Sequence, residues 1–185
     1  MSPRPEQKLF SSFIPNNTHI YTEQKPDIVT QDSIQLSTKD SVRTEFIQAV
    51  DKYITKLFPA SRLTAHSLVT TCETYKFDIV FAMAQGQIES GFGTAGKDKR
   101  TNSAWDGRSV TAMNKLGLDF THPDQSIEPY IVLVKTNYLG DKRTYNDLMN
   151  RYVTLSGHRH ESSLRQTYNR IVRTTNIQEL FNQLI

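Results

Sequence analysis

The chain has 185 residues, of which 37% are hydrophobic and 22% charged, enough for one domain with a buried core or for one domain and an arm. The formal net charge of +3 is small and the basic residues are dispersed, so we predict no dedicated nucleic-acid site. The single cysteine, Cys72, excludes an internal disulfide. No apolar run approaches the roughly 20 residues that a membrane-spanning helix needs, so we predict no membrane span.

Residues 1–39 are predicted to form an extended N-terminal arm. Four prolines and several polar runs interrupt this segment, which is typical of chain without a core of its own. Scattered apolar residues such as Phe10 and Phe13 could dock the arm on a larger assembly such as a phage particle. The first residues lack the apolar stretch of a secretory signal, so we expect delivery by lysis, by non-classical secretion or within a virion.

Residues 40–185 are predicted to form one mainly α-helical domain. Val42, Phe46, Val50 and Ile54 recur at four-residue steps and give one apolar stripe, and Pro59 closes that helix. A second helix is expected from Thr64 to Tyr75. Further helices are expected from Asp124 onward, over 144–153, over 164–173 and over 176–184.

A third helix is predicted over residues 79–90, with Asp78 as its N-cap and Gly91 and Gly93 at its end. It is apolar almost all round, which predicts burial. The stretch that follows, residues 94–121, has no sustained periodicity and is expected to form loops with a short hairpin. The fold class predicted from the whole pattern is α-helical with one irregular insertion.

Glu89 is the candidate for acid chemistry. A carboxyl group at the C-terminal end of an apolar helix is poorly solvated and faces the negative pole of the helix dipole, and both effects favour its protonated form. A proton retained in this way is what a general acid needs. The alternative interpretation is an ordinary polar residue at a frayed helix end.

The segment Ala82 to Thr94, AMAQGQIESGFGT, resembles the catalytic-helix motif of the lysozyme-like superfamily and is most similar to the glucosaminidases of glycoside hydrolase family 73. Residues 101–105, 120–130 and 151–168 resemble later segments of that family in the same order. The resemblance covers about residues 40–184. It implies an α+β lysozyme-like fold with a short hairpin.

The activity that this resemblance implies is cleavage of β-1,4 glycosidic bonds in the glycan strands of peptidoglycan, at the bacterial cell wall and without a cofactor. Glu89 would protonate the leaving oxygen, and the implied specificity is that of an endo-β-N-acetylglucosaminidase. A muramidase or a lytic transglycosylase would use the same acid. A rival of another class is a non-catalytic glycan-binding or structural virion module on the same scaffold.

The second carboxylate is less well defined by the sequence. Retaining and inverting hydrolysis both ordinarily use two carboxyl groups, and in the resembling family the second lies on the hairpin. The interval between Trp105 and Phe120 contains Asp106 and Asp119 but no Glu. We favour Asp106, which a Trp-Asp-Gly turn also explains without catalysis; Asp98 is a weaker alternative.

Sugar binding requires aromatic faces and amide or hydroxyl groups. Trp105, Asn102 and Ser103 are the candidates in the irregular segment, and the resemblance adds Tyr168, whose counterpart lines the cleft. Core packing is the alternative for both Trp105 and Tyr168. We predict no metal site, because His158 and His160 lack an apparent third ligand.

Overall fold

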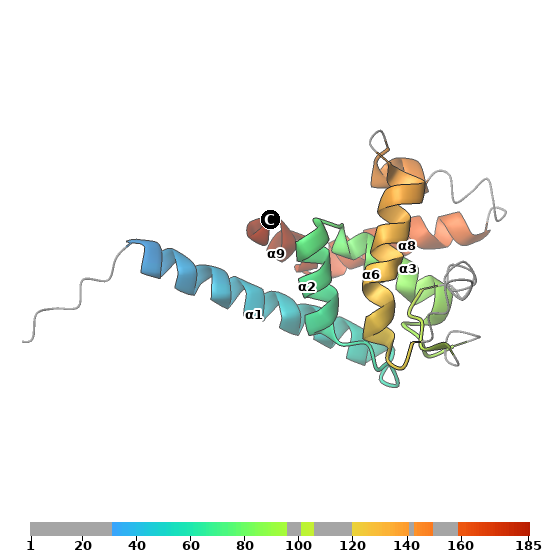
Figure 1. Cartoon of the computed structure of the whole chain (residues 1–185), viewed down its shortest axis with the longest axis horizontal. Helices are drawn as coiled ribbons and strands as arrows, with labels where there is room; N and C mark the ends of the chain where they lie inside the picture. Colours follow the sequence, from blue (N-terminus) through green and yellow to red (C-terminus); the bar gives the residue numbers. More distant parts are fainter. Residues whose placement is uncertain (1–30, 96–100, 106–119, 141–142, 150–158) are drawn as a thin grey trace, which may run out of the picture.

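The computed structural model describes residues 31–95, 101–105, 120–140, 143–149 and 159–185, and for 31–37 and 159–163 it describes the helical backbone alone. Within these ranges the chain consists of helices and connecting turns, without a strand (Figure 1). The prediction of a mainly α-helical chain is confirmed. The lysozyme-like details stay a prediction, because the interval expected to hold the hairpin falls largely outside the described residues.

Helix α1, Gln31–Leu57, is the longest element, with 27 residues and a length of about 40 Å. Its first part extends beyond the rest of the molecule (Figure 1), and Phe46 is its first fully buried side chain. The prediction of an extended arm as far as residue 39 is therefore wrong for residues 31–39, which are helical because they continue the helix that Phe46 anchors. Residues 1–30 lie outside the described residues.

Helices α2, Ala65–Tyr75, and α3, Ile79–Ser90, are both capped, and α3 has the caps that the sequence predicts, Asp78 and Gly91. The Thr64 hydroxyl accepts the Ser67 N–H at 3.3 Å, and the Asp124 carboxylate accepts the Thr64 N–H at 2.8 Å. Lys76, at φ 47°, ends α2 in the left-handed conformation. Both boundaries of the predicted third helix are confirmed.

The C-terminal half adds a 3-10 turn η1, Pro123–Ser126, the helix α6, Ile127–Leu133, and the π-helical turn η2, Val134–Leu139. Helices α8, Arg159–Thr174, and α9, Ile177–Leu184, complete the domain. Of the helix expected over 144–153, residues 145–149 are helical and the remainder lies outside the described residues.

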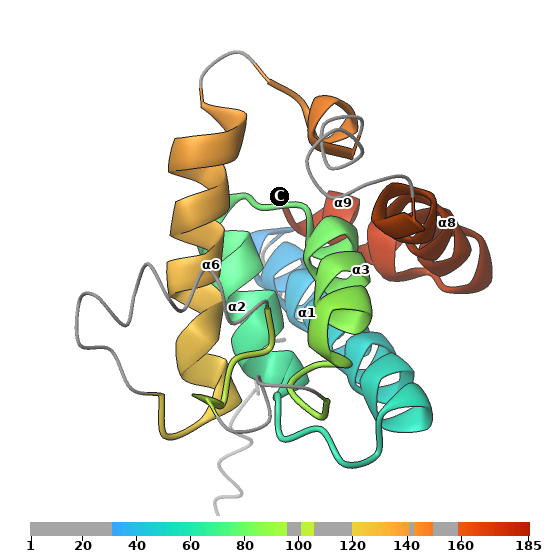
Figure 2. The ribbon, with the colours of Figure 1, turned by 90° about the vertical axis from the view of Figure 1, so that its right-hand side faces the viewer.

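Helix α3 occupies the middle of the domain. Figure 2 shows it between α2 and α8, with α6 on the other side of α2, and it packs on α2, α8 and α9. Its first eight residues, 79–86, are all buried. The core around it consists of aromatic and aliphatic side chains, among them Phe77, Phe81, Met83, Phe92, Trp105, Ile131 and Leu164.

Asp78 connects the start of α3 to two other segments. Its carboxylate accepts the Phe81 N–H at 3.0 Å and the Tyr168 hydroxyl at 2.9 Å, while its own N–H donates to the Tyr145 hydroxyl at 2.9 Å. Burial raises the pKa of the Asp78 carboxyl. Burial likewise raises the pKa of Tyr145, to about 12, so both tyrosines are neutral partners at physiological pH.

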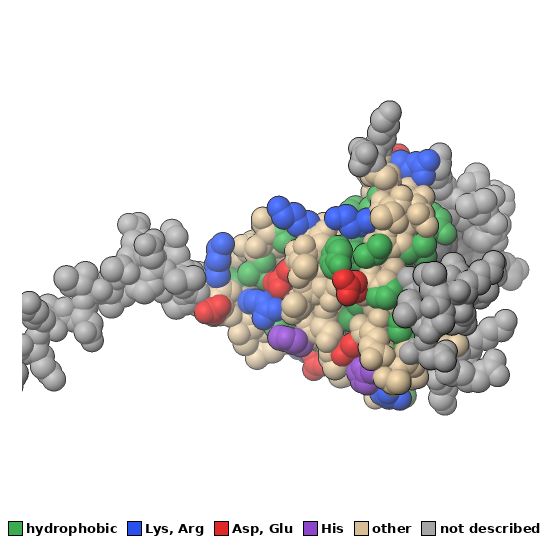
Figure 3. All heavy atoms as spheres, in the orientation of Figure 1, with side chains coloured by type: hydrophobic (Ala, Val, Ile, Leu, Met, Phe, Trp, Pro, Cys, Tyr) green, Lys and Arg blue, Asp and Glu red, His purple; other side chains and the backbone are tan. Residues whose placement is uncertain are grey.

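The surface in Figure 3 mixes charged, apolar and neutral polar side chains. No described helix is both long enough and apolar enough to pass through a lipid bilayer.

Asp78→Asn is expected to change the pH dependence of stability. A carboxyl whose folded-state pKa is raised above its unfolded value of about 3.8 stabilises the fold below that value, and this contribution is lost as the pH rises through the folded pKa. The wild type should therefore lose unfolding free energy from about pH 4 upward, measured by urea denaturation. Asn keeps the cap but does not titrate, so the slope should flatten; an unchanged slope would contradict this account.

Candidate active site

Glu89 lies in the last turn of α3 and is half-buried, after eight consecutive buried residues. The carboxyl group therefore sits where the apolar part of the helix reaches the surface. The backbone at this end of α3 forms the negative pole of the helix dipole. The structure confirms that Glu89 lies in the last turn of α3, while its role as a general acid stays a prediction.

A left-handed turn follows Glu89 directly. Gly91, Phe92 and Gly93 have φ values of 56°, 53° and 80°, and the Gly91 and Phe92 N–H groups donate to the carbonyl groups of Gln87 and Gly86 at 3.1 and 3.0 Å. Phe92 is a non-glycine residue in this conformation, and its fully buried ring packs edge-on against Phe58 with 5.4 Å between centroids. Packing of the ring offsets the strain of its backbone.

Ser90 joins the turn to the irregular segment. Its hydroxyl accepts the Gly93 N–H and donates to the Ala104 carbonyl, both at 2.8 Å. Because Ser90 is only 1% exposed, these bonds are shielded from water. The side chain after Glu89 therefore fixes residues 101–105 against the end of α3.

The side chains of Asn102 and Ser103 form hydrogen bonds with the protein's own backbone. The Asn102 amide donates to the Phe120 carbonyl at 2.8 Å, and Asn102 itself has a φ of 51°. The Ser103 hydroxyl is buried and bonds to the backbone of Trp105. Both residues hold the 101–105 segment in place, and Asn102 is the more exposed of the two.

Trp105 is a core residue. Its side chain is 1% exposed, its indole N–H donates to the Ala82 carbonyl at 2.8 Å, and its ring stacks on Tyr130 at 4.6 Å and 10°. The prediction that this indole stacks on sugar is wrong for this conformation, because no ring face reaches the surface. The indole can pack here because residue 86 is glycine: a Cβ at this position would lie 3.1 Å from the indole nitrogen.

Tyr168 lies at the other end of α3 from Glu89. Its hydroxyl donates to Asp78, eleven residues before Glu89, which corresponds to about 16 Å along a helix. Burial and the neighbouring Asp78 charge raise the pKa of this hydroxyl. The structure therefore does not bring Tyr168 to the Glu89 carboxyl. Instead of lining a cleft, as predicted, Tyr168 connects α8 to the start of α3.

Several candidates lie outside the described residues: Asp98, Asp106, Asp119 and His158. Their position relative to Glu89 stays a prediction. Among the residues that are described, no group of three or more His, Cys, Asp or Glu side chains has the arrangement of a metal site.

Two tyrosine–glutamine pairs on α3 were not identified as site residues from the sequence. The Tyr130 hydroxyl donates to Gln85 at 2.5 Å, and the Tyr53 hydroxyl donates to Gln87 at 2.7 Å. The signal for them was the presence of two amides within an apolar helix, since a buried amide is costly without a hydrogen-bond partner. The partner tyrosines could not be inferred from local spacing.

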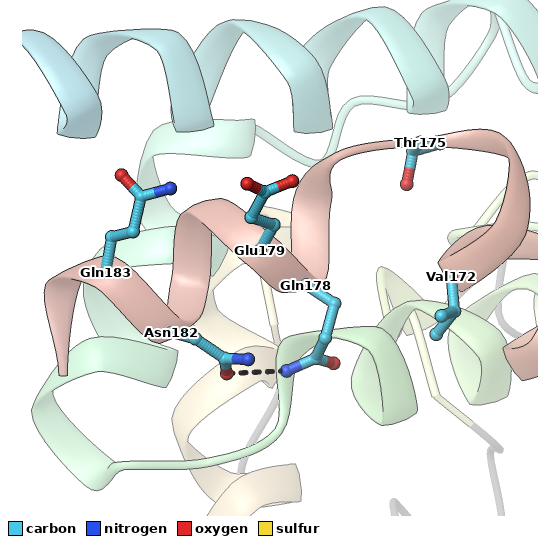
Figure 4. A pocket seen from close by; sticks show the side chains of 6 residues that line it. All are labelled: Val172, Thr175, Gln178, Glu179, Asn182 and Gln183. Atoms are coloured by element: carbon cyan, nitrogen blue, oxygen red, sulfur yellow. Dashed lines mark hydrogen bonds between the residues drawn. The ribbon is translucent and has the colours of Figure 1, made fainter.

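A hollow of about 510 Å³ lies along the junction of α8 and α9. Figure 4 shows Gln178 and Asn182 joined across it by an amide hydrogen bond of 3.0 Å. Its lining is rich in amides, and none of the predicted site residues contributes to it; the lining residues are Val172, Thr175, Gln178, Glu179, Asn182 and Gln183. This hollow is therefore separate from the Glu89 site.

Comparison of the chain with protein-family models, with curated proteins and with solved structures finds no match in any of the three. The functional argument therefore depends on the residues and their geometry.

Gly91→Ala is expected to destabilise the protein by about 2–5 kcal/mol, because a left-handed Ala costs about 1–2 kcal/mol and overpacking adds about 1–3 kcal/mol. The largest steric conflict is with the Phe58 ring, which would lie 2.7 Å from the new Cβ, and the Thr94 hydroxyl oxygen would lie 2.9 Å from it. Urea denaturation of the two single variants and of the double variant with Phe58→Ala measures the coupling. The double variant should lose less than the sum of the single losses; additive losses would contradict this explanation.

Proposed function

We propose that this protein is a peptidoglycan hydrolase that cleaves β-1,4 glycosidic bonds of the glycan strand, with Glu89 as general acid. The observation that carries the proposal is the environment of Glu89: a half-buried carboxyl in the last turn of a helix whose first eight residues are buried, followed by a tightly packed left-handed turn. The preferred specificity is that of an endo-β-N-acetylglucosaminidase, in keeping with the resemblance of residues 82–94 to family 73 enzymes.

In this mechanism Glu89 transfers its proton to the glycosidic oxygen as the bond to the anomeric carbon breaks. The resulting carboxylate can then take a proton from an incoming water molecule or from the substrate itself. Gly91 has no side chain, and the Phe58 ring and the Thr94 hydroxyl lie within 3 Å of where its Cβ would be. Asp106 remains the proposed second carboxylate.

The first test is digestion of purified peptidoglycan, with mass spectrometry of the released fragments. Glu89→Gln removes the proton but keeps the shape of the side chain, so the rate should fall at least about 100-fold while glycan binding persists. Glu179→Gln is the matched control, because it makes the same change at an exposed position on α9. Fragments ending in reducing N-acetylglucosamine would support the proposed specificity.

Other fragments would change the assignment. Reducing-end N-acetylmuramic acid would indicate a muramidase, and its 1,6-anhydro form would indicate a lytic transglycosylase. Equal rates for the wild type and Glu89→Gln would remove Glu89 from the mechanism.

A non-catalytic glycan-binding or virion module is the second candidate. The burial of Trp105 and the distance of Tyr168 from Glu89 favour it, because they remove two predicted sugar contacts. Glycan binding without any fragment release by the folded protein would support this module over the enzyme.

We also propose that the N-terminal residues tether the domain to a larger assembly such as a phage particle. Because α1 begins at Gln31, deletion of residues 1–30 removes the proposed tether and keeps this helix. The deletion should leave the melting temperature and the rate on purified peptidoglycan within about twofold, while co-sedimentation with the assembly is lost. Retained co-sedimentation would refute the tether.

A further inference from the structure

The 3-10 turn η1 is capped by His122, with a ring nitrogen of the imidazole as the acceptor. The His122 Nδ1 accepts the Asp124 N–H at 3.3 Å, and in return the Gln125 side chain accepts the His122 N–H at 3.3 Å. A ring nitrogen can accept a hydrogen bond only while it carries no proton. This cap therefore requires a neutral imidazole, whereas a cap made by Ser, Thr or Asn does not depend on protonation.

The same ring nitrogen has a second partner within reach. The Asp124 carboxylate oxygen Oδ2 lies 3.5 Å from the His122 Nδ1. That oxygen already accepts the hydroxyl groups of Thr64 at 2.7 Å and Ser67 at 3.0 Å, which occupy its two lone pairs. Protonation of His122 turns Nδ1 into a donor, so the ring releases the Asp124 N–H and competes for an oxygen that is bound at the start of α2.

The charges around this turn include a second imidazole. The His122 side chain is 39% exposed, so solvent protons reach the ring. Arg62, before α2, donates to the Thr121 carbonyl at 3.1 Å. The other ionic side chains on the elements around η1, among the described residues, are His66 and Glu73 on α2, Asp78 and Glu89 at the two ends of α3, and Glu128 on α6.

The capped turn is bonded to residues 101–105 on both sides of the cap. Before the cap, the Phe120 carbonyl accepts the Asn102 side-chain amide at 2.8 Å. After the cap, the Ser126 hydroxyl, on a residue only 2% exposed, accepts the Ala104 N–H at 3.1 Å. A change in the shape of η1 therefore reaches the segment that is fixed against the end of α3.

We propose that His122 is a pH-sensitive cap: a neutral ring holds η1 and residues 101–105 in place, and protonation of the ring opens the cap and loosens that segment. Histidine side chains titrate between about pH 5 and pH 8, so the change falls in the physiological range. The inference goes beyond the proposed function and does not depend on it.

The test is amide hydrogen exchange of the full-length protein, measured by NMR and expressed as protection factors, which removes the intrinsic pH dependence of exchange. From about pH 8 to about pH 5, the Asp124 amide should lose about fivefold in protection, the scale of one hydrogen bond, and the Ala104 amide at least about twofold. Both losses should follow the protonation of His122, read from the carbon-bound protons of its ring.

Three variants identify the group responsible. His122→Asn provides a cap that does not titrate, so the protection of both amides should become independent of pH. His66→Asn is the matched control, because it removes an exposed imidazole on α2, and it should keep the pH dependence of the wild type. His122→Ala has no side-chain acceptor, so the Asp124 amide should be poorly protected at every pH, which keeps the test decisive if His122→Asn does not fold.

Two results would overturn the inference. One is a loss of protection on acidification that persists in His122→Asn, because another group would then be responsible. The other is a loss confined to the Asp124 amide, because the cap would then open without loosening residues 101–105. Since no step of the test uses peptidoglycan, its outcome is independent of whether Glu89 acts as a general acid.

Discussion

The burial of α3 is the constraint on which the rest of the structure depends. A helix whose first eight residues are all buried cannot leave a polar side chain without a partner, because an unpaired polar group costs several times more inside the protein than at its surface. Each polar residue of α3 described above is accordingly bound by another segment: Asp78 by α8, Gln85 by α6, Gln87 by α1 and Ser90 by residues 101–105. The polar groups of one helix therefore specify how its neighbours are placed.

The two ends of this helix have different properties. At the N-terminal end the Asp78 carboxylate accepts the Phe81 N–H and the Tyr168 hydroxyl, and the Asp78 N–H donates to the Tyr145 hydroxyl, so this residue fixes two tyrosines. At the C-terminal end Glu89 is half-buried and is followed by a turn in which a Cβ at Gly91 would clash with Phe58. The first of these two carboxyl groups has a structural role, and for the second, eleven residues later, we propose proton transfer.

The sequence predicts local features well and tertiary partners poorly. The cap at Asp78 and the end of α3 at Gly91 follow from residue types whose preferences act within one turn. Trp105 was interpreted as a sugar platform because it is the only tryptophan and lies in an irregular segment. Its burial depends on Gly86 and Tyr130, 19 residues before it and 25 residues after it, and no local pattern links these positions.

The family resemblance likewise did not predict the tertiary partner of Tyr168. The order of motifs placed a tyrosine near the cleft, but the side chain that contacts Tyr168 is the cap of α3 and not Glu89 at its other end. Helix periodicity placed the start of α1 at Asp40, where the apolar stripe begins. The helix starts at Gln31, because a helix whose nucleus has formed can extend without a further apolar stripe.

That outward growth gives α1 two thermodynamic regimes. Residues 38–41 are exposed, so the hydrogen bonds of this turn are held mainly by propagation along the helix and open at low cost. From Phe46 onward an amide can open only when the core opens. Amide protons along this one helix should therefore exchange with solvent at rates that fall steeply toward Phe46. The rates at its two ends would distinguish local fraying of the helix from unfolding of the whole domain.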